Sequence, residues 1–537
     1  MIKDLFSDER LLFTKATPNS DAIPTIFAFP NEYSVGITSL GYQIVWATLA
    51  MCPDIEISRL FTDTHESLPR KPELVGFSMS WELDYVNILN LLEFLEIPLR
   101  SATRDNNDPL IFGGGPVLTA NPEPFADFFD IILLGDGENL LGNFIEVYKE
   151  VRNADRQTKL RKLAQVPGVY VPSLYEVTYQ AVTGDIKSIQ PVDVEIPKTV
   201  EKQTYRGNVL SASTVVTEKA AWENIYMVEV VRSCPEMCRF CLASYLTLPF
   251  RTASLADSLI PAIEKGLAIT DRLGLLGASV TQHPEFEDLL DYISQEKYDN
   301  VRLSIASVRT NTVTKKLAET LAKRDTRSIT IAVESGSERL RQIVNKKLLN
   351  DEIIQAVVNA KAGGLKGMKL YGMVGIPGEE SGDLDATVAM MRDIKKAAPG
   401  LRLTLGCSTF VPKAHTPFQW FGVKPEAEKR LKFLEKQLKP QGMEFRPESY
   451  KDSVIQALLS RGDRRLSHLL ELTRQYGDSL GSYRRAFKEL RGKLPELGYY
   501  VHADWSTDQV LPWSHLQGPL PQATLEKHLA TATSHFN

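Results

Sequence analysis

Three cysteines lie within eight residues of this chain, in the segment Cys234-Pro-Glu-Met-Cys238-Arg-Phe240-Cys241. They directly follow an apolar run, residues 225–231, that predicts a short buried strand. Thiolates are soft ligands that suit zinc or an iron–sulfur cluster, and a cubane of four irons normally takes four of them. Three thiolates on one loop therefore leave one metal position open. A structural zinc site would need a fourth protein ligand, and no cysteine or histidine follows nearby in the sequence. A zinc loop and chance clustering are the alternatives.

The spacing of these cysteines, C-x3-C-x-aromatic-C with Phe240 as the aromatic residue, resembles the radical S-adenosylmethionine (SAM) superfamily. The resemblance implies a [4Fe–4S] cluster on Cys234, Cys238 and Cys241, with SAM on the open iron. It also implies reductive cleavage of SAM to a 5′-deoxyadenosyl radical, with an electron from a flavodoxin or ferredoxin. In such enzymes the protein mainly positions and shields the chemistry of its cofactor.

Six strand–helix units in residues 221–420 can position this loop. Their strands are expected near residues 225–231, 273–279, 300–306, 328–334, 367–375 and 402–409. Six consecutive parallel units resemble the partial (β/α)6 barrel of the radical SAM superfamily. Functional groups of parallel barrels gather at the carboxyl ends of the strands, and the cysteine loop follows the first of these strands.

Further motifs follow the later strands. Ile331-Ala-Val-Glu334-Ser-Gly-Ser-Glu338 resembles the barrels of Elongator-type and methylthiotransferase-like enzymes. By this resemblance Glu334 accepts hydrogen bonds from the SAM ribose, and Lys346 meets the SAM carboxylate. On spacing alone, Lys346 is equally well a solvated lysine at a helix end.

Two glycine turns complete the SAM residues that the resemblance implies. The turn around Gly277 and Ser279 stands where relatives carry a Gly-Gly-Glu turn that meets the SAM ammonium, but the acid is missing here. Gly375, in Tyr371-Gly-Met-Val-Gly375-Ile-Pro-Gly378, resembles a turn whose backbone packs on the adenine.

Several other residues at the predicted barrel mouth have open roles. Ser307-Val-Arg309 resembles an S-x-R segment whose arginine either binds an acid or pairs on the surface. His283 is interpreted as structural, because it precedes a proline at a helix start. Lys413, His415 and Gln419 lie in a segment that resembles a phrase of an uncharacterised radical SAM family and its methylthiotransferase-like neighbours. They are candidates for the substrate side, and a rigid proline-braced cover is the equal alternative.

Residues 1–153 alternate strands and helices, with glycine turns at 113–116 and 135–138, which predicts a doubly wound parallel sheet. This segment resembles the cobalamin-binding-like domain of the same uncharacterised radical SAM family. The phrases shared with that family are Gly76-Phe-Ser78, Glu82-Leu-Asp-Tyr85, Gly114-Gly-Pro116, Asn121-Pro-Glu-Pro124 and Gly135-Asp-Gly-Glu138. The Asp-x-His-x-x-Gly motif that supplies an imidazole to cobalamin is missing. The segment's single histidine, His65, is interpreted as a solvated loop residue.

The remaining segments are a β-leaning connector, residues 154–220, and a mainly helical C-terminal module, residues 421–537. Residues 461–493 hold nine Lys or Arg against four Asp or Glu. The fold class is therefore α/β, with a flavodoxin-like domain, a radical SAM barrel and a helical module.

Composition limits the function further. The five cysteines leave only Cys52 and Cys407 outside the loop, too few for a second cluster held by cysteines alone. The net charge of −5 gives no global basic field for nucleic acid. No apolar stretch of about 20 residues is present, so we expect a cytoplasmic protein without a membrane partner.

The sequence leaves three functions open. The first is a radical SAM enzyme that modifies RNA or protein, motivated by the methylthiotransferase-like barrel and by the basic residues of 461–493. The second is a cobalamin-dependent radical SAM methyltransferase, motivated by the N-terminal domain. The third is a non-catalytic scaffold that binds the cluster and SAM without turnover.

Overall fold

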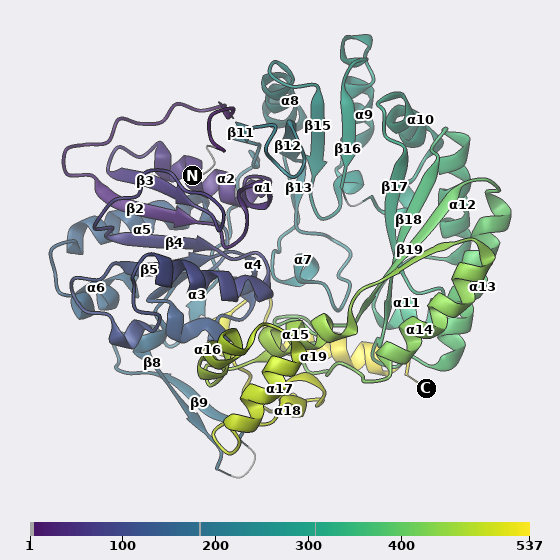
Figure 1. The fold of residues 1–537 in the computed structure, drawn as a ribbon. Helices are drawn as coiled ribbons and strands as arrows, with labels where there is room; N and C mark the ends of the chain where they lie inside the picture. The colour runs from purple at the N-terminus through teal and green to yellow at the C-terminus, as the bar shows by residue number, and fades with distance from the viewer. Residues whose placement is uncertain (1–4, 182–183, 307, 537) are drawn as a thin grey trace. The chain divides into compact units, whose positions relative to one another are not determined.

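The computed structural model describes residues 5–181, 184–306 and 308–536. The chain divides into two compact units, coloured along the sequence in Figure 1. The sheet unit contains Met1–Tyr205, Ser213–Asn224 and Ile455–Pro521, and the barrel unit contains Arg206–Ala212, Ile225–Val454 and Gln522–Asn537. Residues 421–537, predicted as one C-terminal module, are thus shared between the two units.

The core of the sheet unit is a six-stranded sheet in the order β3-β2-β4-β5-β6-β7. All neighbouring strands are parallel except β6 and β7. The strands are β2 (Ile23–Ala28), β3 (Ile55–Leu60), β4 (Leu74–Ser78), β5 (Leu110–Gly114), β6 (Ile131–Leu133) and β7 (Val169–Tyr170). Most of their residues are buried, as expected for parallel strands covered on both faces. Because the first strand lies between the second and third, the order is flavodoxin-like, with its switch point between β2 and β4.

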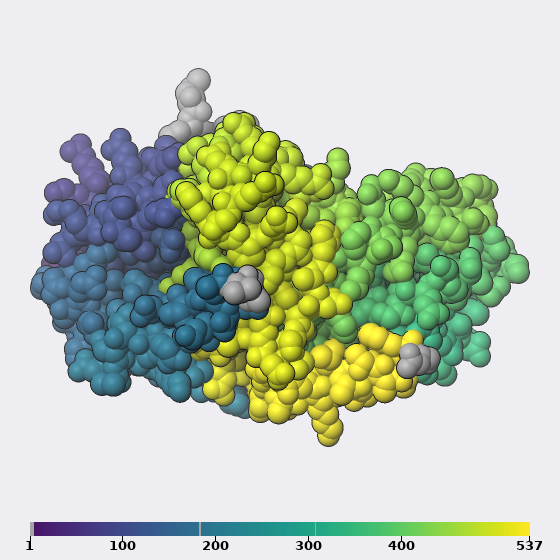
Figure 2. Space-filling model, turned by 90° about the horizontal axis from the view of Figure 1, so that it is seen from below, coloured from purple at the N-terminus to yellow at the C-terminus, as the bar shows by residue number. Residues whose placement is uncertain are grey.

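Helices and short strand pairs complete this unit. The helices are α1 (Tyr33–Gly36), α2 (Leu40–Ala50), α3 (Tyr85–Phe94), α4 (Pro116–Ala120), α5 (Gly137–Val151), α6 (Arg156–Leu163), α16 (Leu466–Tyr476), α17 (Leu480–Glu489) and α18 (Leu497–Val501). The strand pairs are β1 (Arg10–Leu11) with β11 (Val215–Val216), β8 (Tyr175–Tyr179) with β9 (Ile186–Pro191), and β10 (Val200–Glu201) with β21 (Leu516–Gln517). Residues 455–521, yellow-green in Figure 2, lie directly on the purple and blue N-terminal residues of the same unit.

Three of the nine basic residues of 461–493 are engaged inside the sheet unit. Arg464 pairs with the buried carboxylate of Glu123 at 2.9 Å, and Arg465 pairs with Asp463 at 2.6 Å. Arg461 is buried and donates to the carbonyl of Tyr500 at 2.7 Å. These three arginines hold the sheet unit together and therefore do not support the RNA interpretation. The basic residues further along the segment, Arg484, Arg485, Lys488, Arg491 and Lys493, are exposed.

The barrel unit contains two parallel sheets, in the orders β12-β15-β16 and β17-β18-β19-β20. A parallel bridge between Val308 and Ile331 joins their edges. The strands are β12 (Ile225–Glu229), β15 (Arg272–Leu276), β16 (Arg302–Ile305), β17 (Ser328–Glu334), β18 (Gly367–Val374), β19 (Arg402–Thr409) and β20 (Glu444–Pro447). The six predicted barrel strands are confirmed. The seventh, β20, was not predicted.

The helices of the barrel unit cover the outer face of the strands (Figure 1). They are α8 (Ile260–Leu267), α9 (Phe286–Ile293), α10 (Lys315–Lys323), α11 (Glu338–Ile343), α12 (Asn350–Ala362), α13 (Ser381–Ala397) and α14 (Ala427–Leu438), with the short α7 (Leu242–Tyr245) after the cysteine loop. Helix α15 (Tyr450–Arg461) spans the boundary between the two units. No helix of the described residues is both long and apolar enough to cross a membrane.

The last helix, α19 (Gln522–Thr533), belongs to the barrel unit. Its residue Ala532 is part of a buried cluster with Leu340, Ile343, Val344, Ile376, Phe410 and Phe418. Leu529 and Phe536 from the same end of the chain, and Phe240 from the cysteine loop, pack against this cluster. Figure 2 shows the yellow C-terminal residues beside the teal and green residues of the barrel.

Candidate active site

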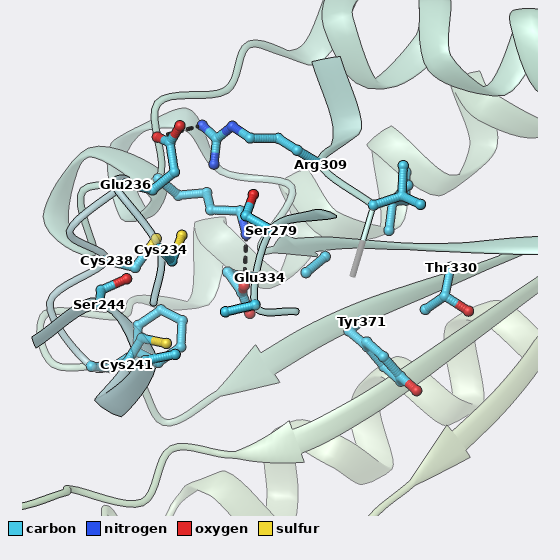
Figure 3. A pocket seen from close by; sticks show the side chains of 17 residues that line it. Cys234, Glu236, Cys238, Cys241, Ser244, Ser279, Arg309, Thr330, Glu334 and Tyr371 are labelled. Carbon is cyan, nitrogen blue, oxygen red and sulfur yellow. Dashed lines mark hydrogen bonds and ion pairs between the residues drawn. The ribbon is translucent and has the colours of Figure 1, made fainter. Parts of the chain in front are cut away.

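The three cysteines line one pocket of the barrel unit (Figure 3). They stand between the strand pair β13 (Val231–Arg232) with β14 (Arg251–Thr252) and helix α7. The loop folds back on itself, because the Cys234 amide donates to the carbonyl of Ala243 at 3.1 Å and the Cys241 amide to that of Cys238 at 2.9 Å. Ser233 and Met237 have φ values of 71° and 56°, which non-glycine residues adopt at a cost in strain. The backbone thus takes a strained path that turns three thiols toward one space.

Contacts from the neighbouring loop hold this conformation. The Asn345 side-chain amide donates to the carbonyls of Met237 at 2.8 Å and Glu236 at 3.1 Å. The Arg239 guanidinium donates to the carbonyls of Ile343 and Gln342 at the end of α11, at 2.7 Å and 2.8 Å. A cation at a helix C-terminus also interacts favourably with the helix dipole. The cysteine loop is therefore preorganised by the protein itself.

The donor chemistry of the loop fits an iron–sulfur cluster. No three His, Cys, Asp or Glu of the described residues are grouped closely enough to hold a single metal ion. In a cubane each thiolate binds a different iron, so its donors stand farther apart than the four ligands around one zinc. Burial raises the pKa of Cys238 to about 12, and Lys346 acts against this rise. A bound metal would stabilise the thiolate form that burial disfavours at Cys238.

Glu334 ends β17 at the rim of the pocket. Its φ of 63° coincides with a shift in the β17–β18 register between Ala332 and Glu334. A strained backbone of this kind is often found at functional sites. Lys346 donates to Glu334 Oε1 at 3.0 Å, and their side chains are 12% and 10% exposed. Burial opposes the charge of Lys346, but Glu334 more than offsets this effect and raises the Lys346 pKa. Lys346 is therefore not a solvated helix-end lysine.

A series of polar side-chain contacts links the loop after β15 to the cysteine loop. Ser279 donates to Gln282 Oε1 at 2.5 Å, and Gln282 donates to Glu236 Oε1 at 2.5 Å. Arg309 pairs with the other oxygen of Glu236 at 2.8 Å, as the dashed line in Figure 3 shows. Ser307, the first residue of the predicted S-x-R segment, lies outside the described residues. The sequence interpretation missed Glu236, although its place between two cysteines was a usable signal.

The structure brings some of the predicted SAM residues together and not others. Phe240, Ser279, Glu334 and Lys346 line the pocket with the three cysteines. Gly277 and Gly375 are not among the lining residues and shape its turns instead. Gly277 has a φ of 150°, and a Cβ there would lie 2.5 Å from the carbonyl oxygen of Val231. The Gly375 amide donates to Glu379 Oε2 at 2.6 Å.

The other candidates at the barrel mouth do not line this pocket either. His283 is buried, with its Nε2 2.7 Å from the carbonyl of Ala253 and its Nδ1 accepting the Glu285 amide at 3.0 Å, which supports its structural interpretation. His415 and Gln419 are buried, and Gln419 accepts the His415 amide at 2.9 Å. Lys413 lies in the same turn. These contacts favour the interpretation of the segment as a rigid cover of the barrel mouth.

His65 of the sheet unit is half-buried rather than fully solvated. Its Nδ1 lies 2.7 Å from the carbonyl of Glu66, its ring contacts Phe94, and its backbone forms an antiparallel bridge with Leu60. His65 follows the second strand, β3, whereas the loop after β2 contains no histidine. The residues at this end of the sheet therefore do not supply the imidazole ligand that the cobalamin motif would.

Comparisons with known proteins agree with this geometry. Residues 228–391 match the model of the radical SAM superfamily, and residues 54–172 match a model of the N-terminal part of radical SAM proteins. An uncharacterised protein of Methanocaldococcus jannaschii is 27% identical over 450 residues, which are 83% of this chain and 90% of that protein. The tRNA-2-methylthio-N(6)-dimethylallyladenosine synthase of Chlorobium phaeovibrioides is 26% identical over 183 residues, 31% of this chain and 39% of that protein.

Among solved structures, the radical SAM methyltransferase TsrM of Kitasatospora setae, with cobalamin and a [4Fe–4S] cluster bound, has a TM-score of 0.50. Its sequence identity is 14%, and the match covers 74% of this chain and 77% of that chain. At this identity the likeness concerns the fold. Taken with the cysteine pocket, the family matches identify the chain as a radical SAM enzyme, a member of a superfamily that uses a [4Fe–4S] cluster and SAM.

Proposed function

We propose that this enzyme cleaves SAM reductively and uses the resulting radical to modify RNA. The observation that carries SAM cleavage is the pocket in which three cysteines face Glu334 and Lys346. RNA is favoured over protein as substrate by the similarity to the methylthio-tRNA synthase, which covers 183 residues. The preference does not use Arg461, Arg464 and Arg465, which are engaged within the sheet unit.

Each pocket residue has a proposed task. Cys234, Cys238 and Cys241 hold the cluster, and Phe240 shields it from the apolar side. Glu334 accepts hydrogen bonds from the ribose hydroxyls of SAM. Lys346 binds the SAM carboxylate, because a cation and a carboxylate form a strong charge-assisted hydrogen bond. Ser279 and the backbone turns at Gly277 and Gly375 complete the SAM site.

A cluster held by Cys234, Cys238 and Cys241 would supply one electron for the reductive cleavage of SAM. This cleavage would give methionine and a 5′-deoxyadenosyl radical, which would take a hydrogen atom from the substrate. The residues that line the pocket would exclude water and hold the cluster and SAM next to each other. Radical SAM enzymes need a low-potential reductant, and we propose a flavodoxin or ferredoxin for this one.

Anaerobic reconstitution tests the proposal. The wild-type protein should bind about four irons per chain and form 5′-deoxyadenosine with dithionite and SAM. Cys52→Ala is the control for cysteine substitution in general. Because Cys52 lies in the sheet unit, this variant should leave the iron content and the yield of 5′-deoxyadenosine unchanged. If the wild-type protein binds the cluster and SAM but forms no 5′-deoxyadenosine, it is a scaffold and the proposal is wrong.

A second candidate function is cobalamin-dependent methylation. The flavodoxin-like strand order of the sheet unit favours it, because such sheets bind ligands at the switch point, here between β2 and β4. The fold shared with the methyltransferase TsrM also supports it. Corrinoid absorbance that remains with the protein after desalting is the expected result. His65→Ala should retain the corrinoid, because binding would not use a protein imidazole. No retention at saturating cobalamin would exclude this function.

A further inference from the structure

The inner face of the four-stranded sheet carries polar side chains in register. Thr330, Lys369, Thr404 and Glu444 form one row across β17, β18, β19 and β20, and Ala332, Tyr371, Gly406 and Arg446 form the next. Residues between these positions on β18, such as Leu370, are buried. Thr330, Ala332 and Tyr371 line the cysteine pocket, so this face continues into the site described above (Figure 3).

Tyr371 presents an aromatic ring at the edge of the pocket. The residue is 56% exposed, which is unusual for a large aromatic residue in the middle of a strand. Its neighbour on β19 is Gly406, where an added Cβ would lie 3.2 Å from the Tyr371 ring. The glycine therefore leaves room for the ring to lie across the adjacent strand. A ring that is both held and exposed is a platform for a planar ligand.

Lys369 supplies a cation on the same face. It lies two residues before Tyr371, so the two Cα atoms are roughly 6.6 Å apart along the strand. Lys369 is exposed and has no ion pair within the described residues. The carboxylate of its row, Glu444, is already held by Arg402 at 2.9 Å and by Arg446 at 2.6 Å. In a chain of net charge −5, this is an uncompensated positive charge beside an exposed ring.

We propose that this face is the substrate site and binds a nucleotide, with its base stacked on Tyr371 and a phosphate on Lys369. The inference rests on the proposed function and adds which part of the RNA substrate is recognised, namely a single nucleotide. Stacking on aromatic side chains together with phosphate–cation pairs is how proteins hold unpaired nucleotides. The hydroxyl of Thr330, the neighbour of Lys369 on β17, adds hydrogen-bonding capacity for a polar ligand. A nucleotide placed here lies next to the proposed SAM site.

The test uses the reconstituted full-length enzyme without SAM. Binding of a fluorescein-labelled single-stranded RNA of about ten nucleotides is measured by anisotropy, and binding of AMP, GMP, CMP and UMP by calorimetry. Tyr371→Ala should weaken RNA binding about tenfold or more, whereas Tyr371→Phe should keep it. Lys369→Met should weaken binding and lower the salt slope by about one. Lys361→Met, an exposed lysine on α12, is the matched control and should change neither.

The results distinguish a nucleotide within RNA from a free nucleotide. They also distinguish a failure of this nucleotide site from a failure of the proposed function. RNA binding without mononucleotide binding assigns the site to a nucleotide within RNA, and binding of both assigns it to free nucleotides as well. Wild-type affinity in Tyr371→Ala, or equal losses in Lys361→Met and Lys369→Met, would overturn the inference. SAM cleavage without any nucleotide or RNA binding would also overturn it and favour a protein substrate. RNA binding that depends on Tyr371 and Lys369, without SAM cleavage, would contradict the proposed function and leave this site intact.

Discussion

The Nζ atom of Lys346 lies 3.0 Å from Oε1 of Glu334, in the pocket that the three cysteines line. This ion pair joins the strained end of β17 to the loop after α11, the same loop whose Asn345 holds the cysteine loop. The two residues that we assign to SAM thus position one another, and Lys346 also keeps a positive charge near the Cys238 thiol.

Breaking this pair should destabilise the barrel unit. Lys346→Met leaves the Glu334 carboxylate buried without its partner, and we expect a loss of about 3 kcal/mol in the free energy of unfolding. The double variant Lys346→Met, Glu334→Gln should recover much of this loss, because no uncompensated charge remains. Urea denaturation of the wild-type protein, the two single variants Lys346→Met and Glu334→Gln, and the double variant gives the coupling energy. Additive losses would contradict a direct interaction.

Asn345 should control how well the cluster is retained. Asn345→Ala removes two hydrogen bonds to the cysteine loop, and should loosen that loop by about 1–2 kcal/mol. We expect faster loss of iron to a chelator, measured by the decay of cluster absorbance. Asn359→Ala is the matched control, because its side chain also donates to a backbone carbonyl, that of Val313, at 2.8 Å. Equal rates in both variants would show that the effect is not specific to the loop.

The C-terminal helix should be necessary for the cysteine loop. The Tyr245 hydroxyl lies 2.8 Å from Nδ1 of His528 on α19 and donates to the carbonyl of Met237 at 3.3 Å. Removal of residues 522–537 also uncovers the apolar cluster on which Phe240 packs. We expect a truncated protein to reconstitute less iron and to bind a hydrophobic dye. His528→Ala tests the hydrogen bond alone and should lower iron retention less. Full iron content in the truncated protein would contradict this role.

Acid should destabilise the sheet unit through His515. Burial lowers the pKa of His515 to about 4, and Arg464 adds to this effect against the opposing pull of Glu123. Between pH 4 and about 6.5 the unfolded chain binds a proton that the folded chain does not, so stability falls as the pH decreases through this range. The loss should approach about 3 kcal/mol. His515→Gln should flatten this part of the stability profile, and an unchanged slope would exclude His515 as its source.

The sequence predicted the strands that position the site better than it predicted the contacts between them. Strands β17 and β19 have the predicted bounds, because their buried residues alternate or run together as parallel strands require. Strand β20 was missed because Glu444–Pro447 is a short edge strand with charges and a proline, which weaken the strand pattern.

Tertiary contacts explain the remaining differences. The pairing of Lys346 with Glu334 and the place of Glu236 in the pocket depend on how loops far apart in the chain meet. The engagement of Arg464 with Glu123, 341 residues away, likewise cannot be read from local charge. Local pattern therefore predicted the three cysteines, Glu334 and Lys346 as pocket residues but missed Glu236, whose place depends on the fold.

One measurement tests the central claim most directly. The reduced, reconstituted protein is mixed with SAM carrying ¹⁵N in its amino group and ¹⁷O in its carboxylate, and the cluster signal is examined by electron–nuclear double resonance. If Cys234, Cys238 and Cys241 hold three irons and SAM the fourth, both labels should couple to the cluster. A cluster signal with no coupling to either label, and a side chain as the fourth ligand, would contradict the account.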